Sequence, residues 1–490
     1  MATTEPAFYF FFSRLVNATS SAGKLLVPSL ALAATAFFSH TMAFTQAIPQ
    51  LTPAASSSSS ALSGHSVTAS PASRLLQSEI ATHAQRVHLV VLIHGWLGSP
   101  SEMASIQEAL EVEIDQANSN EIVGGGRFDD NQSDESVPPV KERSTVEGKE
   151  RRIIPVDTAI VIHSVVSNDG KTHDGIFAGG CRVADEVNSL IKDILSGADN
   201  NSDESGCRKN VYLSFIGNSL GGLYARSAIA SIEWDLPNGD QVKPCIFCTT
   251  ATPHLGKRGQ TYVRLPRLAE QGIGYALKPT GQDLFGLNKV IENLATQAKY
   301  LNPLLRFQKR IAYANAYGTD LQVPTATAAF LADTESKHYT KEIKPPFLLT
   351  VTTPRDENVL ASIAQATDSS SSPHIPASTM ARTLDALGWT KVFCDVRDKL
   401  VSVPIPFRDE ASSEFKAKDE WTSHELKSVV ASRIVHDKKW PIPFGHTMLI
   451  ANSKSELYAK MNQGGKPFVR QLASDFIDDL LQCHKGGEGS

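Results

Sequence analysis

The residues of this chain that could do chemistry begin with a serine between glycines, in Gly217-Asn-Ser219-Leu-Gly221. An apolar run (211–216) precedes this turn, and a run with helical spacing (223–232) follows it. A serine at a tight strand-to-helix turn has a strained backbone, so the positions two before and two after it must be nearly free of side chains. The turn also lifts the hydroxyl of Ser219 clear of the sheet. The pattern therefore predicts a nucleophile elbow, which is typical of acyl transfer.

Acyl transfer also needs donors for the negative charge that develops on the attacked carbonyl oxygen. The amide of Leu220 meets this need, because it follows the serine at a helix N-terminus. A second donor is expected in the loop His94-Gly95-Trp96, where Gly95 lets the backbone turn so that the Trp96 amide faces the same oxygen. Such a donor is worth roughly 3 to 4 kcal/mol of barrier. We expect His94 to fix this loop by hydrogen bonding. The elbow and loop glycines that the arrangement requires are Gly95, Gly217, Gly221 and Gly222.

A serine nucleophile needs an orienting acid, which follows it in the chain order of elbow enzymes. The candidate is Asp320, which comes just after an apolar run (311–317) and a glycine. In parallel sheets, active sites collect at the carboxyl ends of strands. Asp320 could instead be a turn residue or a helix cap. The second candidate acid is Asp398, whose predicted strand is shorter and more charged.

The base of such a site should be a histidine that follows the acid. His446 lies in a turn with apolar surroundings (443–450), shortly before a predicted closing helix (468–481), whereas the other histidines lie in polar or low-complexity sequence. There are two alternatives. His446 could have a purely structural role, or His436 could be the base. The histidines after Asp320 are His338, His374, His424, His436, His446 and His484.

Strand-like apolar runs alternate with helical patterns from residue 87 onward, which predicts a mostly parallel sheet with helices on both faces. The segment 256–307 is expected to line an acyl pocket, to form a lid or to be a structural cap. Insertions are expected near 118–152 and 361–376. The predicted strands are 87–93, 157–163, 211–216, 245–250, 310–317 and 391–396, and the predicted helices include 102–114 and 182–194. The apolar residues of the segment are Leu265, Leu268, Ile273, Tyr275, Leu277, Leu284 and Phe285.

The composition is that of a globular protein with no polyanionic partner. The 490 residues are 41% hydrophobic and 20% charged, with a net charge of −5, which disfavours nucleic-acid binding. The six cysteines are scattered, and no cofactor or metal site is expected. Cys245 and Cys248 stand in an apolar run, so core packing is favoured over metal or redox chemistry.

The first 80 residues have the composition of a targeting segment. No acidic residue stands between Glu5 and Glu79, and the apolar run 25–38 has the length of a signal-peptide core, short of the roughly 20 residues of a membrane span. A Ser/Ala/Thr/Pro-rich stretch (45–73) then resembles a transit peptide. We expect residues 1–80 to be a presequence and linker that directs the chain into the secretory pathway, or to a plastid by a bipartite signal. A mitochondrial leader or a membrane anchor are the alternatives.

Over most of residues 85–480, the chain resembles the serine esterase family of lipase-like eukaryotic α/β hydrolases. The blocks that carry the resemblance are residues 94–95, 171–176 with Gly180, 182–186, 217–222, 252–256 and 280–285. The resemblance implies an α/β-hydrolase fold over residues 81–485, with a cap or lid insertion, and a triad formed here by Ser219, Asp320 and His446. Asn218 departs from the family, in which histidine is common at this position.

Three classes of function stay open on this basis. The first is a serine hydrolase of lipid or acylglycerol esters that acts through an acyl-enzyme and could contact a membrane peripherally. The second is a thioesterase for acyl-protein or acyl-CoA substrates, or a peptidase, with the same triad. The third is a silent binding module that keeps the fold.

Overall fold

The computed structural model describes residues 84–124, 152–196, 210–236, 241–262, 264–332, 339–365, 374–404, 423–430 and 439–483. The expected presequence and linker lie outside these residues, as do most of the two expected insertions. No helix in this described part of the chain is both long enough and apolar enough to cross a membrane.

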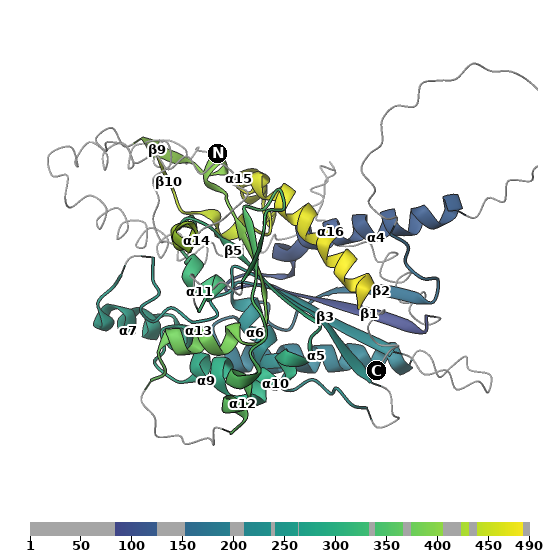
Figure 1. Ribbon diagram of the computed structural model, residues 1–490, viewed down its shortest axis with the longest axis horizontal. Coiled ribbons are helices and arrows are strands. Elements are labelled where there is room, and N and C mark those ends of the chain that lie inside the picture. Colours follow the sequence, from purple (N-terminus) through teal and green to yellow (C-terminus); the bar gives the residue numbers. More distant parts are fainter. Residues whose placement is uncertain are drawn as a thin grey trace, which may run out of the picture. The chain divides into compact units, whose positions relative to one another are not determined.

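A sheet of eight strands runs through the described domain in the order β2-β1-β3-β4-β5-β8-β7-β6. The strands from β2 to β8 pair in parallel, and β7 and β6 add an antiparallel edge. With helices on both faces, this is the α/β-hydrolase architecture, and the predicted fold class is confirmed (Figure 1). The strands of the sheet are β1 (Arg86–Ile93), β2 (Thr158–Ser164), β3 (Asn210–Asn218), β4 (Val242–Thr250), β5 (Lys309–Asn315), β6 (Thr340–Glu342), β7 (Leu349–Thr352) and β8 (Thr390–Cys394), and β9 (Ser402–Pro404) pairs separately with β10 (Lys439–Pro441).

The central strands are continuous apolar runs because both of their faces are covered. Along β1, Leu89, Val91 and Ile93 point into one core, and Val90 and Leu92 point into the other. The helices α5, α6, α9, α10 and α13 cover the first face, and α4 and α16 cover the second (Figure 1). The helices are η1 (Pro100–Met103), α4 (Ala104–Gly124), α5 (Ile176–Ser196), α6 (Leu220–Ala228), α7 (Arg267–Ala276), α8 (Lys278–Leu284), α9 (Val290–Thr296), α10 (Ala298–Arg306), α11 (Thr325–Ala329), α12 (Glu357–Gln365), α13 (Ala377–Asp385), η3 (Arg397–Lys399), α14 (Ser423–Val430), η4 (Gly445–Thr447), α15 (Glu456–Met461), η5 (Gln463–Gly465) and α16 (Lys466–Gln482).

Helix α5 begins six residues before its predicted start at residue 182. The two glycines in its first turns have a low helix propensity, which hides this start in the sequence. They are used for packing, since a Cβ on Gly179 would lie 2.2 Å from the ring of Tyr224 in α6. The amide of Ile176 donates to the carboxylate of Asp283 at 2.6 Å, so a residue of α8 stabilises the start of α5.

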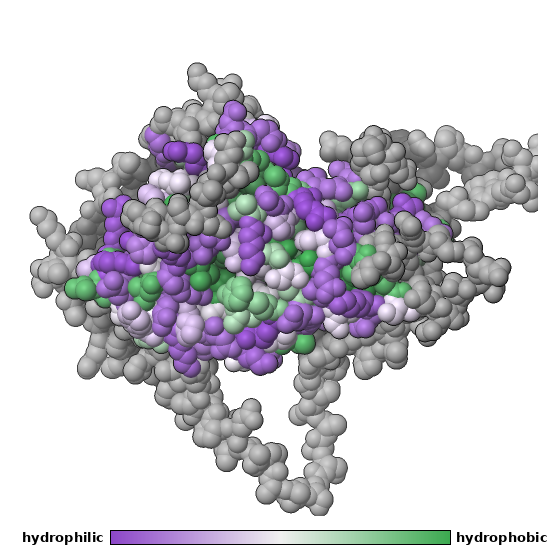
Figure 2. All heavy atoms as spheres, turned by 90° about the horizontal axis from the view of Figure 1, so that it is seen from below, coloured by the Kyte–Doolittle hydropathy of each residue, from purple (hydrophilic) through white to green (hydrophobic). Residues whose placement is uncertain are grey.

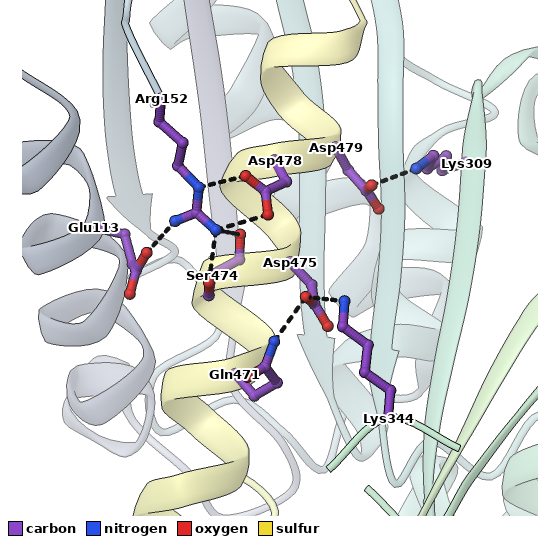
Figure 3. Close-up of polar contacts among 9 residues, drawn as sticks. All are labelled: Glu113, Arg152, Lys309, Lys344, Gln471, Ser474, Asp475, Asp478 and Asp479. Carbon is purple, nitrogen blue, oxygen red and sulfur yellow. Dashed lines mark hydrogen bonds and ion pairs between the residues drawn. The ribbon is translucent and has the colours of Figure 1, made fainter. Parts of the chain in front are cut away.

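Ion pairs and polar contacts fix the C-terminal helix α16 to the rest of the domain (Figure 3). They reach residues 474–479 of the helix from β5 and from two connecting segments, and Arg152 also bridges to Glu113 of α4. The partners are Arg152 with Glu113, Asp478 and Ser474, Lys309 with Asp479, and Lys344 with Asp475, to which Gln471 also donates.

A disulfide joins the start of the sheet's fourth strand to the end of α16, between Cys245 and Cys483. The two residues are 238 positions apart. The prediction of core packing for Cys245 and Cys248 is confirmed, since both side chains are buried in the core, but the disulfide of Cys245 was not predicted. Cys248 is a free, buried thiol, and burial raises its pKa above the usual range of a cysteine. No spacing rule in the sequence points from Cys245 to so distant a partner.

Candidate active site

Ser219 occupies the turn between β3 and α6 with backbone angles φ 52° and ψ −121°. A non-glycine residue in this region is strained and persists only where its surroundings hold it. The amide of Ser219 donates to the carbonyl of Thr250 at 2.8 Å. A Cβ on Gly221 would lie 2.2 Å from the carbonyl oxygen of Ile93, and one on Gly217 would lie 2.6 Å from the backbone of Gly222. These positions therefore require glycine, because backbone atoms cannot move aside.

The loop after β1 lies directly against the serine. A Cβ on Gly95 would be only 2.9 Å from the Cβ of Ser219. The next amide along the chain is that of Trp96, the predicted oxyanion donor, and the indole Nε1 of Trp96 donates to Nδ1 of His173 at 3.3 Å. Burial lowers the pKa of His173, and the charge of Lys278 lowers it further, so the neutral imidazole can accept this hydrogen bond.

Two more residues of the same loop are held in place by side chains. The amide of Leu97, a residue with a positive φ of 55°, donates to Oγ1 of Thr172 at 3.0 Å. His94 is buried, and its Nδ1 lies 3.1 Å from the carbonyl oxygen of Gly95. The family block at residues 171–176 thus supports the loop.

Glu102 links this loop to the segment that carries the histidine. Its buried carboxylate accepts hydrogen bonds from the amide of Gly95 at 2.9 Å and from Nδ2 of Asn452 at 3.0 Å. The amide of Asn452 in turn donates to the carbonyl of Thr447, next to His446, at 3.0 Å. Sequence reasoning missed Glu102 and Asn452, because neither residue stands in a motif of its own.

Asp320 and His446 form a buried pair. Nδ1 of His446 lies 2.8 Å from Oδ2 of Asp320, and both side chains are nearly inaccessible to solvent. The other carboxylate oxygen accepts hydrogen bonds from the amides of Gln322 and Val323, each at 2.8 Å. Nδ2 of Asn315 donates to Oδ2 at 3.1 Å. Both oxygens of the acid are therefore fixed, and the imidazole is held through Nδ1.

Main-chain hydrogen bonds join the loop of the acid to the loop of the base. The amide of Leu321 donates to the carbonyl of Pro443, and the amide of Gly445 donates to that of Thr319, each at 2.9 Å. A Cβ on Gly445 would lie 2.8 Å from this same carbonyl oxygen, so the two loops are in close contact. The acid and the base are therefore positioned as one unit, although 125 residues separate them in the chain.

The strand order brings the serine and this pair to the same edge of the sheet. Gly95, Ser219 and Asp320 follow β1, β3 and β5, which run in parallel, and β4 lies between the last two. The hydroxyl of Ser219 forms no hydrogen bond with His446 among the described residues. Such catalytic contacts often tighten only when substrate is bound.

The alternative site residues are placed differently or lie outside the described part. Asp398 is exposed in η3, and Nδ1 of His374 pairs with Oε1 of Glu292 at 2.6 Å. His338, His436, His484 and the side chain of His424 lie outside the described residues. Asn218 is buried beside the serine and accepts a hydrogen bond from Oγ1 of Thr250 at 2.9 Å, which accounts locally for this departure from the family.

The segment 256–307 divides between core and surface. Leu284 and Phe285 are buried in the core, and Ile273 and Leu277 pack against it, while Leu268 and Tyr275 are exposed. A pocket of about 300 Å³ adjoins the buried part. It is lined by Leu255, Arg258, Leu284, Gly286, Asn288, Ile291, Glu292, His374, Ile375, Pro376, Ala377 and Met380. Within the described residues, no group of three or more His, Cys, Asp or Glu side chains could hold a metal ion.

Comparison with known proteins finds a family and a relative to which parts of this chain are similar. Residues 146–354, which include Ser219 and Asp320, match the family described as "Putative serine esterase". Over 179 residues, the chain is also 34% identical to the protein named "Putative lipase ROG1" of Saccharomyces cerevisiae. This match covers 35% of the chain and 23% of that relative, so the chain spans less than a quarter of the relative's length. Residues 146–354, which include the strained serine, are thus similar to a family of serine esterases.

Proposed function

We propose that this protein is a serine hydrolase that cleaves carboxylic esters of lipids or acylglycerols through an acyl-enzyme. The observation that carries the proposal is the strained Ser219 at the sheet edge where Asp320 and His446 are paired. A lipid ester is favoured because the family is one of esterases and the relative in yeast is named a lipase.

The first half of the reaction forms the acyl-enzyme. Nε2 of His446 takes the proton of the Ser219 hydroxyl while Oγ bonds to the ester carbonyl carbon. The carbonyl oxygen becomes an oxyanion facing the amides of Trp96 and Leu220. His446 then gives its proton to the departing alcohol, whose bond to carbon breaks. Throughout, Asp320 keeps the Nδ1–H tautomer and stabilises the imidazolium.

The second half returns the enzyme to its starting state. His446 takes a proton from water, and the hydroxide oxygen bonds to the acyl carbon. The bond from Oγ to that carbon breaks, and Ser219 recovers the proton from His446. The net reaction is ester plus water giving alcohol plus carboxylic acid, with no redox step.

The test is Ser219→Ala, assayed with short-chain and long-chain p-nitrophenyl esters and with a matched thioester. Loss of the nucleophile is expected to lower turnover by up to about 10⁶. Ser231→Ala, at an exposed position after α6, is the matched control and should leave turnover unchanged. Unchanged hydrolysis by Ser219→Ala would contradict the proposal. If the wild type cleaved the thioester faster than the matched ester, the thioesterase would be favoured. Failure of a fluorophosphonate probe to label the wild type would favour the silent binding module.

We propose in addition that residues 1–80 direct the chain into the secretory pathway. The disulfide between Cys245 and Cys483 supports this, because disulfides persist in oxidising compartments. Imaging a fluorescent protein fused to residues 1–80 tests the proposal. A fusion that stays in the cytosol or enters mitochondria would contradict it, whereas onward transport to a plastid would support the bipartite signal.

A further inference from the structure

Helix α7 presents an apolar stripe to solvent. Its outward positions recur with the spacing of one helix face, and its buried positions include Glu270 and Gly274. The side chain of Leu268 is 83% exposed and that of Tyr275 is 66% exposed. Hydrophobic side chains reach the surface at the left of Figure 2, on the side where Figure 1 places α7. The stripe consists of Leu268, Ala269, Gly272, Tyr275 and Ala276. This is the reverse of the usual surface helix, whose exposed face is polar.

The exposed charged residues that flank the stripe along the chain are cationic, and the exposed carboxylate of Asp174 on a neighbouring segment is paired with Arg182. Arg264 and Lys278 are exposed on either side of α7. Between residues 255 and 289, the acidic residues are Glu270 and Asp283, and both are buried. Glu270 accepts hydrogen bonds from the amide of Gly259 and from Arg267, and Asp283 accepts them from Ile176 and Asn288. A partner at this surface therefore meets apolar groups with cations beside them.

The stripe is held facing outward by contacts on the inner side of the helix. Arg267 donates to the carbonyl oxygens of Phe285 and Gly286 at 2.7 and 2.9 Å. Glu270 ties the helix to the backbone of Gly259 at 2.9 Å. The side chains of Leu268 and Tyr275 thus project into solvent from a helix whose inner side is fixed by hydrogen bonds.

The segment that follows this surface contacts a support of the predicted oxyanion loop. After α7 the chain passes Lys278, and the amide of Thr280 donates to the carbonyl of His173 at 3.3 Å. His173 accepts the hydrogen bond from the indole of Trp96, in the predicted oxyanion loop. The segment after α7 is therefore connected to the predicted oxyanion loop through His173.

We propose that the α7 stripe, with Arg264 and Lys278, is a docking surface for bilayers that contain anionic lipids. Apolar side chains of such a helix insert at the boundary between headgroups and acyl chains, and flanking cations attract anionic headgroups. A lipid bilayer is favoured over a protein partner because the proposed substrate is a lipid ester, and docking would deliver that ester to the site. This role in delivery rests on the proposed function, but the binding of vesicles does not.

The experiment measures binding of the full chain to sedimented vesicles of phosphatidylcholine, with and without phosphatidylglycerol. The wild type is expected to bind the anionic vesicles, and to bind them less at high salt. The double variant Leu268→Glu with Tyr275→Glu should lower the binding constant by about tenfold or more. Leu457→Glu is the matched control, because Leu457 is as exposed as Tyr275, at 66%, but lies on α15. This control variant should bind the vesicles as the wild type does.

Further arms separate docking from its alternatives. Arg264→Gln with Lys278→Gln should weaken binding to the anionic vesicles, with Lys460→Gln as its control. Equal binding to neutral vesicles, unaffected by salt, would overturn the choice of anionic lipid. A double variant that binds as the wild type does would overturn the docking surface. The docking surface would also be overturned if the wild type bound no vesicles and formed a dimer that the double variant could not form.

Activity on a short soluble ester distinguishes failure of the docking from failure of the proposed function. The double variant of α7 should keep this activity within about twofold, because both side chains are exposed and neither belongs to the proposed catalytic groups. It should lose activity on the same ester chemistry presented in anionic vesicles. Ser219→Ala should show the opposite behaviour, with vesicle binding kept and both activities lost.

Discussion

At the scale of single residues, the Asp320 carboxylate is engaged on both oxygens. One oxygen faces His446 and Asn315, and the other accepts two backbone amides. Asp320→Asn keeps the shape but can present an amide N–H to Nδ1 of the imidazole, which favours the wrong tautomer. We expect turnover to fall by about 10⁴ with little change in KM. Steady-state kinetics on a soluble ester would check this, and Asp398→Asn, at an exposed position, should be near wild type.

In the proposed reaction, we expect Glu102 to act through the position of another residue. Glu102→Ala removes the acceptor for the amide of Gly95 and for Asn452, which frees the loop that carries the Trp96 amide. A displacement of about 1 Å there can cost on the order of 100-fold in turnover. Glu102→Gln keeps one acceptor and should recover part of the rate, a graded rescue that loss of folding alone would not produce. Equal rates for both variants and the wild type would contradict the assignment.

The sequence predicted residues with a local backbone signature and missed those that act across the fold. The glycines around Ser219 are needed by the turn itself, so the pattern is visible without a structure. Asn315 donates to the carbonyl of Gly445 across 130 positions, and Glu102 reaches Asn452 across 350 positions. Only the folded chain brings such partners together.

At the scale of elements, Glu186 joins α5 to the end of β2. Its carboxylate lies 2.7 Å from Nε2 of His163 and accepts the amides of Val166 and Ser167 at 3.0 and 2.9 Å. Burial acts to raise the pKa of Glu186, but these hydrogen bonds prevail and lower it from 4.5 to about 2. The folded pKa lies below the unfolded one, so the stabilisation is present above about pH 4.5 and is lost as the pH falls towards 2.

Glu186→Gln should therefore lower the free energy of unfolding at neutral pH, by about 1 to 2 kcal/mol after allowance for solvent screening. The gap to the wild type should narrow below about pH 4.5 and nearly close near pH 2. Urea unfolding across this range measures both quantities. Glu108→Gln, at an exposed position on α4, should show no such dependence, and a constant gap for Glu186→Gln would contradict the prediction.

Strands buried on both faces were predictable because each is a continuous apolar run with turn residues around it. The six parallel strands and α16 were found in this way, with boundaries shifted by a few residues. The antiparallel strands β6 and β7, of three and four residues, give too short a pattern. The start of α5 depends on Asp283, which no local rule connects to it.

At the scale of the whole molecule, the disulfide closes a very long loop by joining β4 to the end of α16. Replacing both residues, Cys245→Ser with Cys483→Ser, should lower the free energy of unfolding by about 2 to 4 kcal/mol, with a lower Tm without reductant. Adding reductant should lower the free energy of unfolding of the wild type towards that of the double variant. Cys181→Ser, which removes a free cysteine, is the control. A double variant as stable as this control would show that the bond contributes nothing.

The joined loops of the acid and the base have a consequence for how this molecule can change in evolution. The stretch from residue 321 to residue 443 starts and ends at one point, where its two ends are hydrogen-bonded to each other. Residues gained or lost in the loops of that stretch, away from Gln322, Val323 and the buried strand β8, should leave the Asp320 to His446 distance unchanged, so differences in length among relatives should accumulate in those loops. The short path from residue 444 to 452, which is held by Thr319 and Glu102, should keep a constant length.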